Sequence, residues 1–220
     1  MPLHLLDNTL WFPPVSDALE DGLLAIGGDL SVERLLLAYR CGIFPWFNED
    51  EPPMWWSPDP RFVLFPDELK VSKSMKQVLR RGDFEFRINT NFQQVINSCR
   101  NVYREGQGGT WIGEDVVEAY TALHRAGFAH SAEAWYKGEL AGGLYGLWLG
   151  GAFFGESMFA HRSNASKFAF INWVNVLKQR GVQLIDCQVY TEHLESLGAR
   201  MINRDEFINA VSMLTDPTRV

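Results

Sequence analysis

Three strand-like runs in the middle of the chain predict an antiparallel β-meander. They cover 131–136, 140–149 and 152–159 and are rich in aromatic and aliphatic residues. The linkers between them are only 137–139 and 150–151, and both contain glycine. Linkers this short join neighbouring antiparallel strands as hairpins. We therefore expect the three runs to lie side by side in one sheet.

Apolar positions at helical spacing, bounded by capping residues, predict helices around this meander. The predicted helices cover 72–81, 92–100, 115–126, 165–180 and a last segment from 205. Asn164 precedes the fourth of these as an expected N-cap, and Gly127 and Gly181 follow the third and fourth. Glycine is the residue that most often terminates a helix, so both ends are well defined.

The last part of the chain is expected to return to the sheet. A buried-looking strand, 182–187, follows the long helix, and a short helix around Leu194 leads to another strand at 199–203. A meander followed by strand–helix–strand is the order found in acyltransferases of the N-acetyltransferase type, a likeness of fold that proves no chemistry. We expect an α/β fold of the α+β kind with a mixed sheet.

Residues 1–62 differ from the rest because they are dense in proline and glycine. One helix is clear there: it begins after Ser31, a favourable N-cap, and ends before Gly42. We expect 1–62 to form a small, irregular N-terminal domain. Residues 63–220 would then form the larger domain, of the N-acetyltransferase-like (GNAT) type.

Composition indicates a soluble, cytoplasmic protein. Of the 220 residues, 46% are hydrophobic and 21% are charged, as in ordinary globular chains. No stretch approaches the roughly 20 apolar residues of a membrane span, and the first ten residues do not resemble a signal peptide. The cysteines and histidines show neither a disulfide framework nor metal-binding spacing. We therefore expect no metal and no membrane partner.

The distribution of charge is more informative than its sum. The net charge of −7 argues against a general nucleic-acid coat protein. Between Lys70 and Arg81, however, the sequence has five cations and no acid. Lys73, Lys76 and Arg80 fall at i, i+3 and i+7, on one helical face. Such a face either contacts phosphates or is simply solvated, and charge does not decide between these interpretations.

Several tryptophans lie in polar or glycine-rich surroundings, namely Trp46, Trp55, Trp56 and Trp111. Trp111 follows the glycine-rich segment 106–110, which lacks the Lys-Ser/Thr ending of a P-loop. A tryptophan beside such a loop suits stacking on a base or an adenosine. The alternative for each ring is that it packs two domains together.

Polar side chains that can support catalysis lie near the ends of two predicted strands. Glu156 has apolar or small neighbours, so its carboxylate either needs a partner or lies on the polar face of its strand. Asp186 and Gln188 end an apolar strand and, being two residues apart, are expected to share one face. Cys187 would face the other way, into packing, and a Cys187–His193 nucleophile pair is a weak alternative.

Taken together, short segments spread over nearly the whole chain resemble one family, the leucyl/phenylalanyl-tRNA–protein transferases. The segments are 22–30, 42–47, 55–61, 109–112, 155–159, 164–167, 184–188 and 196–199. Each is short, and their order makes the resemblance specific. One departure is Ala160, which follows Phe159 where a serine is common in the family.

The resemblance implies a cytoplasmic aminoacyltransferase that needs no cofactor. Such an enzyme moves Leu or Phe, and Met less well, from aminoacyl-tRNA to proteins that begin with Arg or Lys. The product is a destabilising N-terminus read by bacterial N-degron (N-end rule) proteolysis. The partners implied are therefore Leu-tRNA, Phe-tRNA and the acceptor protein, and we expect a monomer.

The resemblance also implies roles for individual residues. The reaction centre falls on Asp186 and Gln188, with Glu156 nearby, while Trp46 and Trp111 would hold the terminal adenosine. The apolar pocket for the transferred side chain would comprise Leu144, Phe153, Met158, Phe170, Trp173 and Ile185. The basic face of Lys73, Lys76 and Arg80 would bind the tRNA.

An aminoacyl ester is already activated, so the main task is to position an amine. The Gln188 carbonyl can accept a hydrogen bond from the amine, and Asp186 can polarise Gln188 or accept the proton through it. The alternative class is a CoA-dependent N-acetyltransferase, but the segment 162–167 lacks the glycines that would cradle a pyrophosphate. A non-catalytic RNA-binding module would leave Asp186 and Gln188 without a task.

Replacing Lys73, Lys76 and Arg80 together with Ala is expected to weaken the binding of Leu-tRNA and Phe-tRNA alike, because phosphate contacts read no sequence. The slope of log K against log salt should flatten by about 0.7–0.9 per lost phosphate contact. Turnover at saturating donor should change little. Binding titrations at several salt concentrations measure the slope, and an unchanged slope would mean that this helix face is merely solvated.

Overall fold

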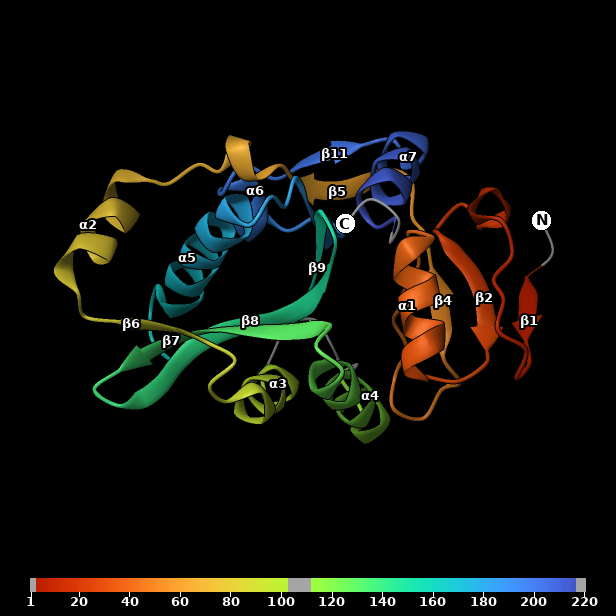
Figure 1. Cartoon of the computed structure of the whole chain (residues 1–220), viewed down its shortest axis with the longest axis horizontal. Coiled ribbons are helices and arrows are strands. Elements are labelled where there is room, and N and C mark those ends of the chain that lie inside the picture. The colour runs from red at the N-terminus through yellow and green to blue at the C-terminus, as the bar shows by residue number, and fades with distance from the viewer. Residues whose placement is uncertain (1–2, 103–111, 217–220) are drawn as a thin grey trace.

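The computed structural model describes residues 3–102 and 112–216. Within these ranges, seven strands form the larger sheet, in the order β11-β5-β10-β9-β8-β7-β6 (Figure 1). The strands are β5 (Arg61–Leu64), β6 (Glu85–Ile88), β7 (Ala129–Tyr136), β8 (Glu139–Leu149), β9 (Ala152–Ala160), β10 (Leu184–Gln188) and β11 (Arg200–Ile202). Neighbouring strands are antiparallel except β9 and β10, which are parallel. The predicted meander and the mixed sheet are confirmed.

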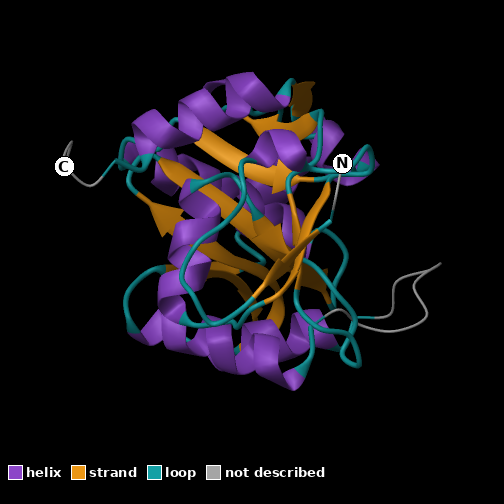
Figure 2. Cartoon of the chain, turned by 90° about the vertical axis from the view of Figure 1, so that its right-hand side faces the viewer, coloured by secondary structure: helices purple, strands orange, loops and turns teal. Residues whose placement is uncertain are grey.

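Helices cover both faces of this sheet, as Figure 2 shows. One face packs against α3 (Phe92–Arg100) and α4 (Glu114–Arg125), and the other against α5 (Ala165–Gln179). Phe153 and Phe154, adjacent in β9, belong to these two different cores because side chains alternate along a strand. None of the helices in the described ranges is long and apolar enough to cross a membrane.

The remaining helices frame the sheet. They are α2 (Lys73–Arg81), α6 (Glu192–Glu195) and α7 (Arg204–Leu214), with a short 3-10 turn, η2 (Pro66–Glu68). Met75 of α2 is buried in the same core as α5, so one side of α2 is packed. The predicted helices at 72–81, 92–100 and 115–126 are therefore confirmed to within a residue or two.

The N-terminal part is less irregular than the sequence suggests. Among its described residues, four strands form a small sheet in the order β1-β2-β4-β3. They are β1 (His4–Leu6), β2 (Leu23–Gly27), β3 (Phe44–Pro45) and β4 (Met54–Trp56), with a 3-10 turn, η1 (Val15–Asp17), and the expected helix α1 (Val32–Arg40). The Ser31 hydroxyl caps α1 by accepting from the Arg34 N–H. Strands of two to five residues leave almost no periodic signal, which is why they escape prediction.

One further expectation, the capping of α5, differs from the structure, and a second, the domain division, stays a prediction. Asn164 does precede α5, but it adopts a left-handed conformation (φ 68°) and its side chain makes no capping hydrogen bond. Asparagine tolerates that conformation better than most residues, so its role is to turn the chain. The proposed domain boundary between 62 and 63 falls inside β5, which begins at Arg61 and belongs wholly to the larger sheet.

An opening between β9 and β10 positions the functional site. The two strands pair only as far as Phe154 and Asp186, yet both continue, to Ala160 and Gln188. Beyond that point β9 pairs only with β8 and β10 only with β5. The groups that follow Phe154 and Asp186 therefore face a gap rather than a neighbouring strand.

Candidate active site

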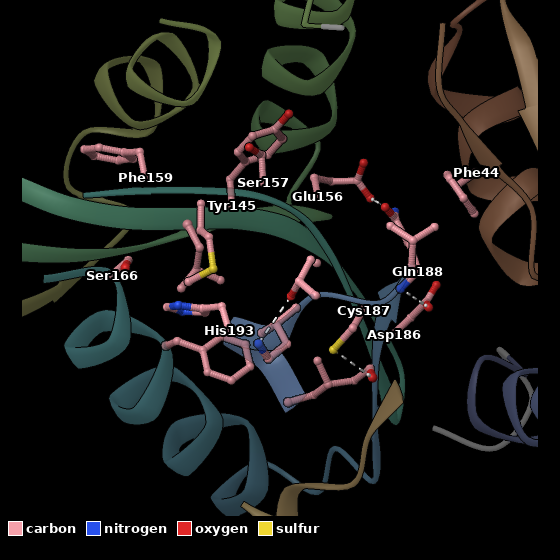
Figure 3. Close-up of a pocket in the computed structure, with 18 of the residues that line it drawn as sticks. Phe44, Tyr145, Glu156, Ser157, Phe159, Ser166, Asp186, Cys187, Gln188 and His193 are labelled. Carbon is pink, nitrogen blue, oxygen red and sulfur yellow. Dashed lines mark hydrogen bonds between the residues drawn. The ribbon is translucent and has the colours of Figure 1, made fainter. Parts of the chain in front are cut away.

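A cavity of about 540 Å³ lies where β9 and β10 part (Figure 3). Its walls come from β8, β9 and β10, from α5 and α6, and from the segment 44–46 of the N-terminal part. Most of the lining is apolar, and the two carboxylates, Glu156 and Asp186, lie with Gln188 at one end. This volume is typical of pockets that bind small molecules.

The structure brings most of the predicted substrate-binding residues to this cavity. Those that line it are Trp46, Leu144, Met158, Phe170 and Ile185. Phe153 and Trp173 are buried and do not line it; their rings pack at 5.5 Å in the core on the α5 side of the sheet. Trp111 lies outside the described residues.

Asp186 is held by a buried ion pair with Arg61 of β5. The guanidinium donates from Nε to Oδ1 at 2.8 Å and from Nη2 to Oδ2 at 2.7 Å, and both side chains are buried. Two rings enclose the guanidinium, Phe44 of β3 and Phe207 of α7, each with its centroid 4.6 Å away. A bidentate pair with aromatic faces fixes the orientation of the carboxylate.

Gln188 sits on a distorted part of β10. Its φ of 64° is left-handed, and the register with β5 shifts between Asp186 and Gln188. Its backbone N–H donates to Asp186 Oδ1 at 2.9 Å, and its Nε2 donates to Glu156 Oε1 at 3.0 Å. The side-chain carbonyl oxygen forms no hydrogen bond with a described residue. The side-chain amide of Gln188 therefore contacts Glu156, while Asp186 contacts its backbone N–H.

Glu156 is buried and held by two tyrosines from different helices. Tyr39 of α1 donates to Oε1 at 2.7 Å and Tyr120 of α4 donates to Oε2 at 2.8 Å, and the two hydroxyl oxygens are in close contact with each other. Burial, and then the negative charge of Asp186, raise the pKa of Glu156 to about 7, although the tyrosine bonds and Arg61 act in the opposite direction. This carboxyl group can therefore exchange a proton near neutral pH.

Cys187 faces away from Asp186, into packing, as its position between Asp186 and Gln188 predicts. It packs on the α5 side of the sheet, opposite Asp186, and its thiol points to the Ile185 carbonyl oxygen at 3.9 Å. Burial raises the pKa of the thiol well above its usual value. A thiolate is the reactive form, so the structure does not favour a Cys187–His193 nucleophile pair.

The predicted tRNA-binding residues lie apart from the cavity. Lys73, Lys76 and Arg80 are exposed along α2, at the end of the molecule opposite the N-terminal strands (Figure 1). No ion pair found within 3–102 and 112–216 involves any of them. The face is therefore free to meet phosphates, and its role stays a prediction.

Sequence reasoning missed Arg61, Tyr39 and Tyr120. Arg61 begins a short apolar strand, Arg-Phe-Val-Leu, and an arginine in such a strand is a signal for a buried partner. Tyr39 lies on the buried face of α1, and Tyr120 on that of α4, where a tyrosine hydroxyl usually finds an acceptor. These signals indicate buried polar contacts and do not reveal which carboxylate is contacted.

Titration of Glu156 is expected to lower the stability of the protein between pH 4.5 and about pH 7. The first value is the usual pKa of a glutamate and the second is the pKa of Glu156 in the folded protein. In that window the unfolded chain has lost the proton and the folded chain still binds it, so stability falls with increasing pH. Glu156→Gln removes this titration. The Tm of the variant minus that of the wild type should therefore increase between pH 4.5 and pH 7.5, and a constant difference would contradict the shifted pKa.

Comparison with known proteins shows which family the chain belongs to. A family model described as leucyl/phenylalanyl-tRNA protein transferase matches residues 63–212, and the model of its N-terminal domain matches 28–59. A leucyl/phenylalanyl-tRNA–protein transferase of Flavobacterium johnsoniae is 56% identical over 94% of this chain and 98% of the relative. One of Myxococcus xanthus is 53% identical over 100% of this chain and 95% of the relative.

Solved structures give weaker matches. A GCN5-related N-acetyltransferase-like protein from Streptococcus suis aligns with 12% identity and a TM-score of 0.39, covering 75% of this chain and 61% of that one. A GCN5-related N-acetyltransferase from Kribbella flavida aligns with 10% identity and a TM-score of 0.40, over 72% and 56%. The family assignment follows from the sequence matches: this chain belongs to the leucyl/phenylalanyl-tRNA–protein transferase family.

Proposed function

We propose that this chain, as a cytoplasmic monomer, moves leucine or phenylalanine, and methionine less well, from aminoacyl-tRNA onto proteins that begin with Arg or Lys. Family membership supports transfer from tRNA to a protein. The observation that carries the proposal is the Gln188 amide, which Glu156 and Asp186 hold at one end of an apolar cavity. The product would carry a destabilising N-terminus and enter N-degron proteolysis.

The apolar walls suit the side chain of the donor. Leu144, Met158, Phe170 and Ile185 would surround it, and such a pocket separates Leu, Met and Phe poorly, because a methylene is worth only about 1–3 kcal/mol. Side chains branched at Cβ would be rejected by shape. Trp46 is 38% exposed at the cavity, where its ring can stack on the terminal adenosine.

The reaction needs an amine aimed at an ester carbonyl. The Gln188 carbonyl oxygen would accept a hydrogen bond from the acceptor's amine and direct its lone pair at the carbonyl carbon. The new C–N bond forms, the C–O bond to the ribose breaks, and the ribose oxygen takes a proton from the nitrogen. Positioning of this kind can lower a barrier by about 7–11 kcal/mol.

The two carboxylates would have separate tasks. An α-ammonium group has a pKa of about 7.7–8.0 and must lose a proton before it attacks. Glu156, whose pKa is raised to about 7, is a base of matching strength beside Gln188, so we assign that proton to it. Asp186 is occupied by Arg61 and by the Gln188 N–H, so we assign it the positioning of Gln188.

The alternative of a CoA-dependent N-acetyltransferase has less support. A pyrophosphate is usually cradled by a glycine-rich turn at a helix N-terminus. The turn before α5 has Asn164 in the left-handed position and no glycine between 161 and 165.

A transfer assay tests the proposal. The protein is incubated with Leu-tRNA and acetyl-CoA carrying different labels and with a peptide that begins with Arg. We expect the leucyl label to appear on the peptide, a peptide beginning with Ala to gain far less, and Val-tRNA to be a poor donor. Movement of the acetyl label, or of neither label, would contradict the proposed function.

Active-site variants in the same assay separate chemistry from binding. Gln188→Ala and Asp186→Ala are each expected to reduce turnover at least tenfold, as the loss of one stabilising hydrogen-bonding group does elsewhere. The Kd of aminoacyl-tRNA should change little because the apolar pocket stays intact. Wild-type turnover in both variants would refute the assigned roles.

A further inference from the structure

Two turns at the α2 end of the molecule carry a cationic and aromatic cluster that the reaction does not use. Arg162, in the turn between β9 and α5, lies with its guanidinium carbon 4.2 Å from the centre of the Tyr136 ring. Lys137 places its Nζ 5.5 Å from the same ring. Arg162 and Lys137 are exposed and Tyr136 is half-buried. The cluster therefore presents to solvent a flat guanidinium that rests on a half-buried aromatic ring.

The position of Lys137 adds to this observation. Lys137 (φ 51°) and Gly138 (φ 83°) are both left-handed, the conformation of a tight two-residue hairpin turn. Asparagine, aspartate or glycine is the favoured first residue of such a turn, and a lysine there is strained. A strained residue that holds a cation beside an aromatic ring is a reason to look for a ligand.

The cluster is continuous with the basic end of α2. Phe84, which follows the end of α2, packs against Tyr136 at 5.9 Å and against Phe168 of α5 at 5.4 Å. Arg80 and Arg81 lie in the last turn of α2. No ion pair found in the described part of the chain involves Arg80, Arg81, Lys137 or Arg162. The exposed acids near these cations along the chain are Asp83, Glu85 and Glu139. Glu85 is paired with Arg87, so these four cations outnumber the remaining two acids.

The cluster is also continuous with the cavity. Ala160 and Ser166, which flank the turn that carries Arg162, both line it. The N–H groups of His161 and Arg162 donate to the Ala141 carbonyl oxygen at 2.8 and 3.1 Å, which anchors the turn on β8. A ligand that leaves the cavity past Ala160 therefore meets Arg162 and Tyr136 next, and α2 after them.

We propose that Tyr136, Lys137 and Arg162 form a platform for single-stranded RNA. It holds the nucleotides that immediately precede the terminal adenosine of the donor tRNA. Bases stack on tyrosine rings and on guanidinium planes, and the lysine neutralises phosphate. The inference rests on the proposed function, because it takes the cavity as the site of the aminoacyl-adenosine. The platform would give the donor tRNA a second contact region, between the cavity and α2.

A series of donors of increasing length tests the platform. Wild-type protein and Arg162→Ala are compared with leucyl-adenosine, with the leucyl ester of the trinucleotide CCA, and with full-length Leu-tRNA. In the wild type, KM should fall when the two cytidines are added. In Arg162→Ala that gain should shrink about tenfold, the scale of one lost stacking contact. Turnover of leucyl-adenosine should stay at the wild-type value.

Matched variants distinguish stacking from charge and from folding. Tyr136→Leu keeps an apolar residue against Phe84 and removes the ring. The fall in KM on adding the two cytidines should therefore shrink in this variant as it does in Arg162→Ala. Arg180→Ala removes an exposed cation at the other end of α5 and should behave as wild type. Lys137→Ala, which removes the cation assigned to phosphate, should instead flatten the salt dependence of the CCA donor by about 0.7.

Different results would refute the platform and the proposed function. If Arg162→Ala and Tyr136→Leu gain as much from the added cytidines as the wild type does, the platform is refuted and the proposed function stands. If the wild type transfers leucine from none of the three donors, the proposed function itself is refuted.

Discussion

The buried pair of Arg61 and Asp186 is the interaction on which the site depends. Burying two charges is costly, and the cost is offset only by good geometry and further contacts. Here both oxygens of the carboxylate are bonded, and Phe44 and Phe207 enclose the guanidinium. Phe44 belongs to the N-terminal part and Phe207 to the last helix, so the pair also ties distant segments to the larger sheet. Removing one partner of such a pair typically costs about 3–5 kcal/mol.

The conformation of Gln188 follows from that pair. Once Arg61 fixes Asp186, its Oδ1 can accept the Gln188 N–H, and this bond stabilises a left-handed residue at the end of β10. The turn directs the Gln188 side chain to Glu156, which two tyrosines hold from α1 and α4. One carboxylate is thus matched by a cation and the other by neutral donors, and burial raises the pKa of the second, Glu156, to about 7.

The sequence predicted the long elements well because their apolar periodicity and glycine stops are local signals. Several short strands, such as β3 and β5, depend on pairing with distant segments and were missed, whereas β10 and β11 were predicted at 182–187 and 199–203. In the site, Asp186 and Gln188 could be selected from their place at a strand end and from the family resemblance. Arg61 and Tyr39 are 125 and 117 residues away from the carboxylates they contact, so no local pattern links them. The register shift before Gln188 also breaks the alternation, which is why the contact with Glu156 was not foreseen.

We infer that the bidentate guanidinium of Arg61 orients Asp186 and, through it, Gln188. Steady-state kinetics of leucyl transfer by Arg61→Lys test it most directly, because lysine keeps the charge and loses the bidentate geometry. Arg200→Lys is the matched control, since Arg200 makes a bidentate pair with Glu68 at the surface. We predict a kcat at least tenfold lower for Arg61→Lys, with KM for Leu-tRNA and the folded state retained, and wild-type kinetics for Arg200→Lys. A wild-type kcat for Arg61→Lys would contradict the account.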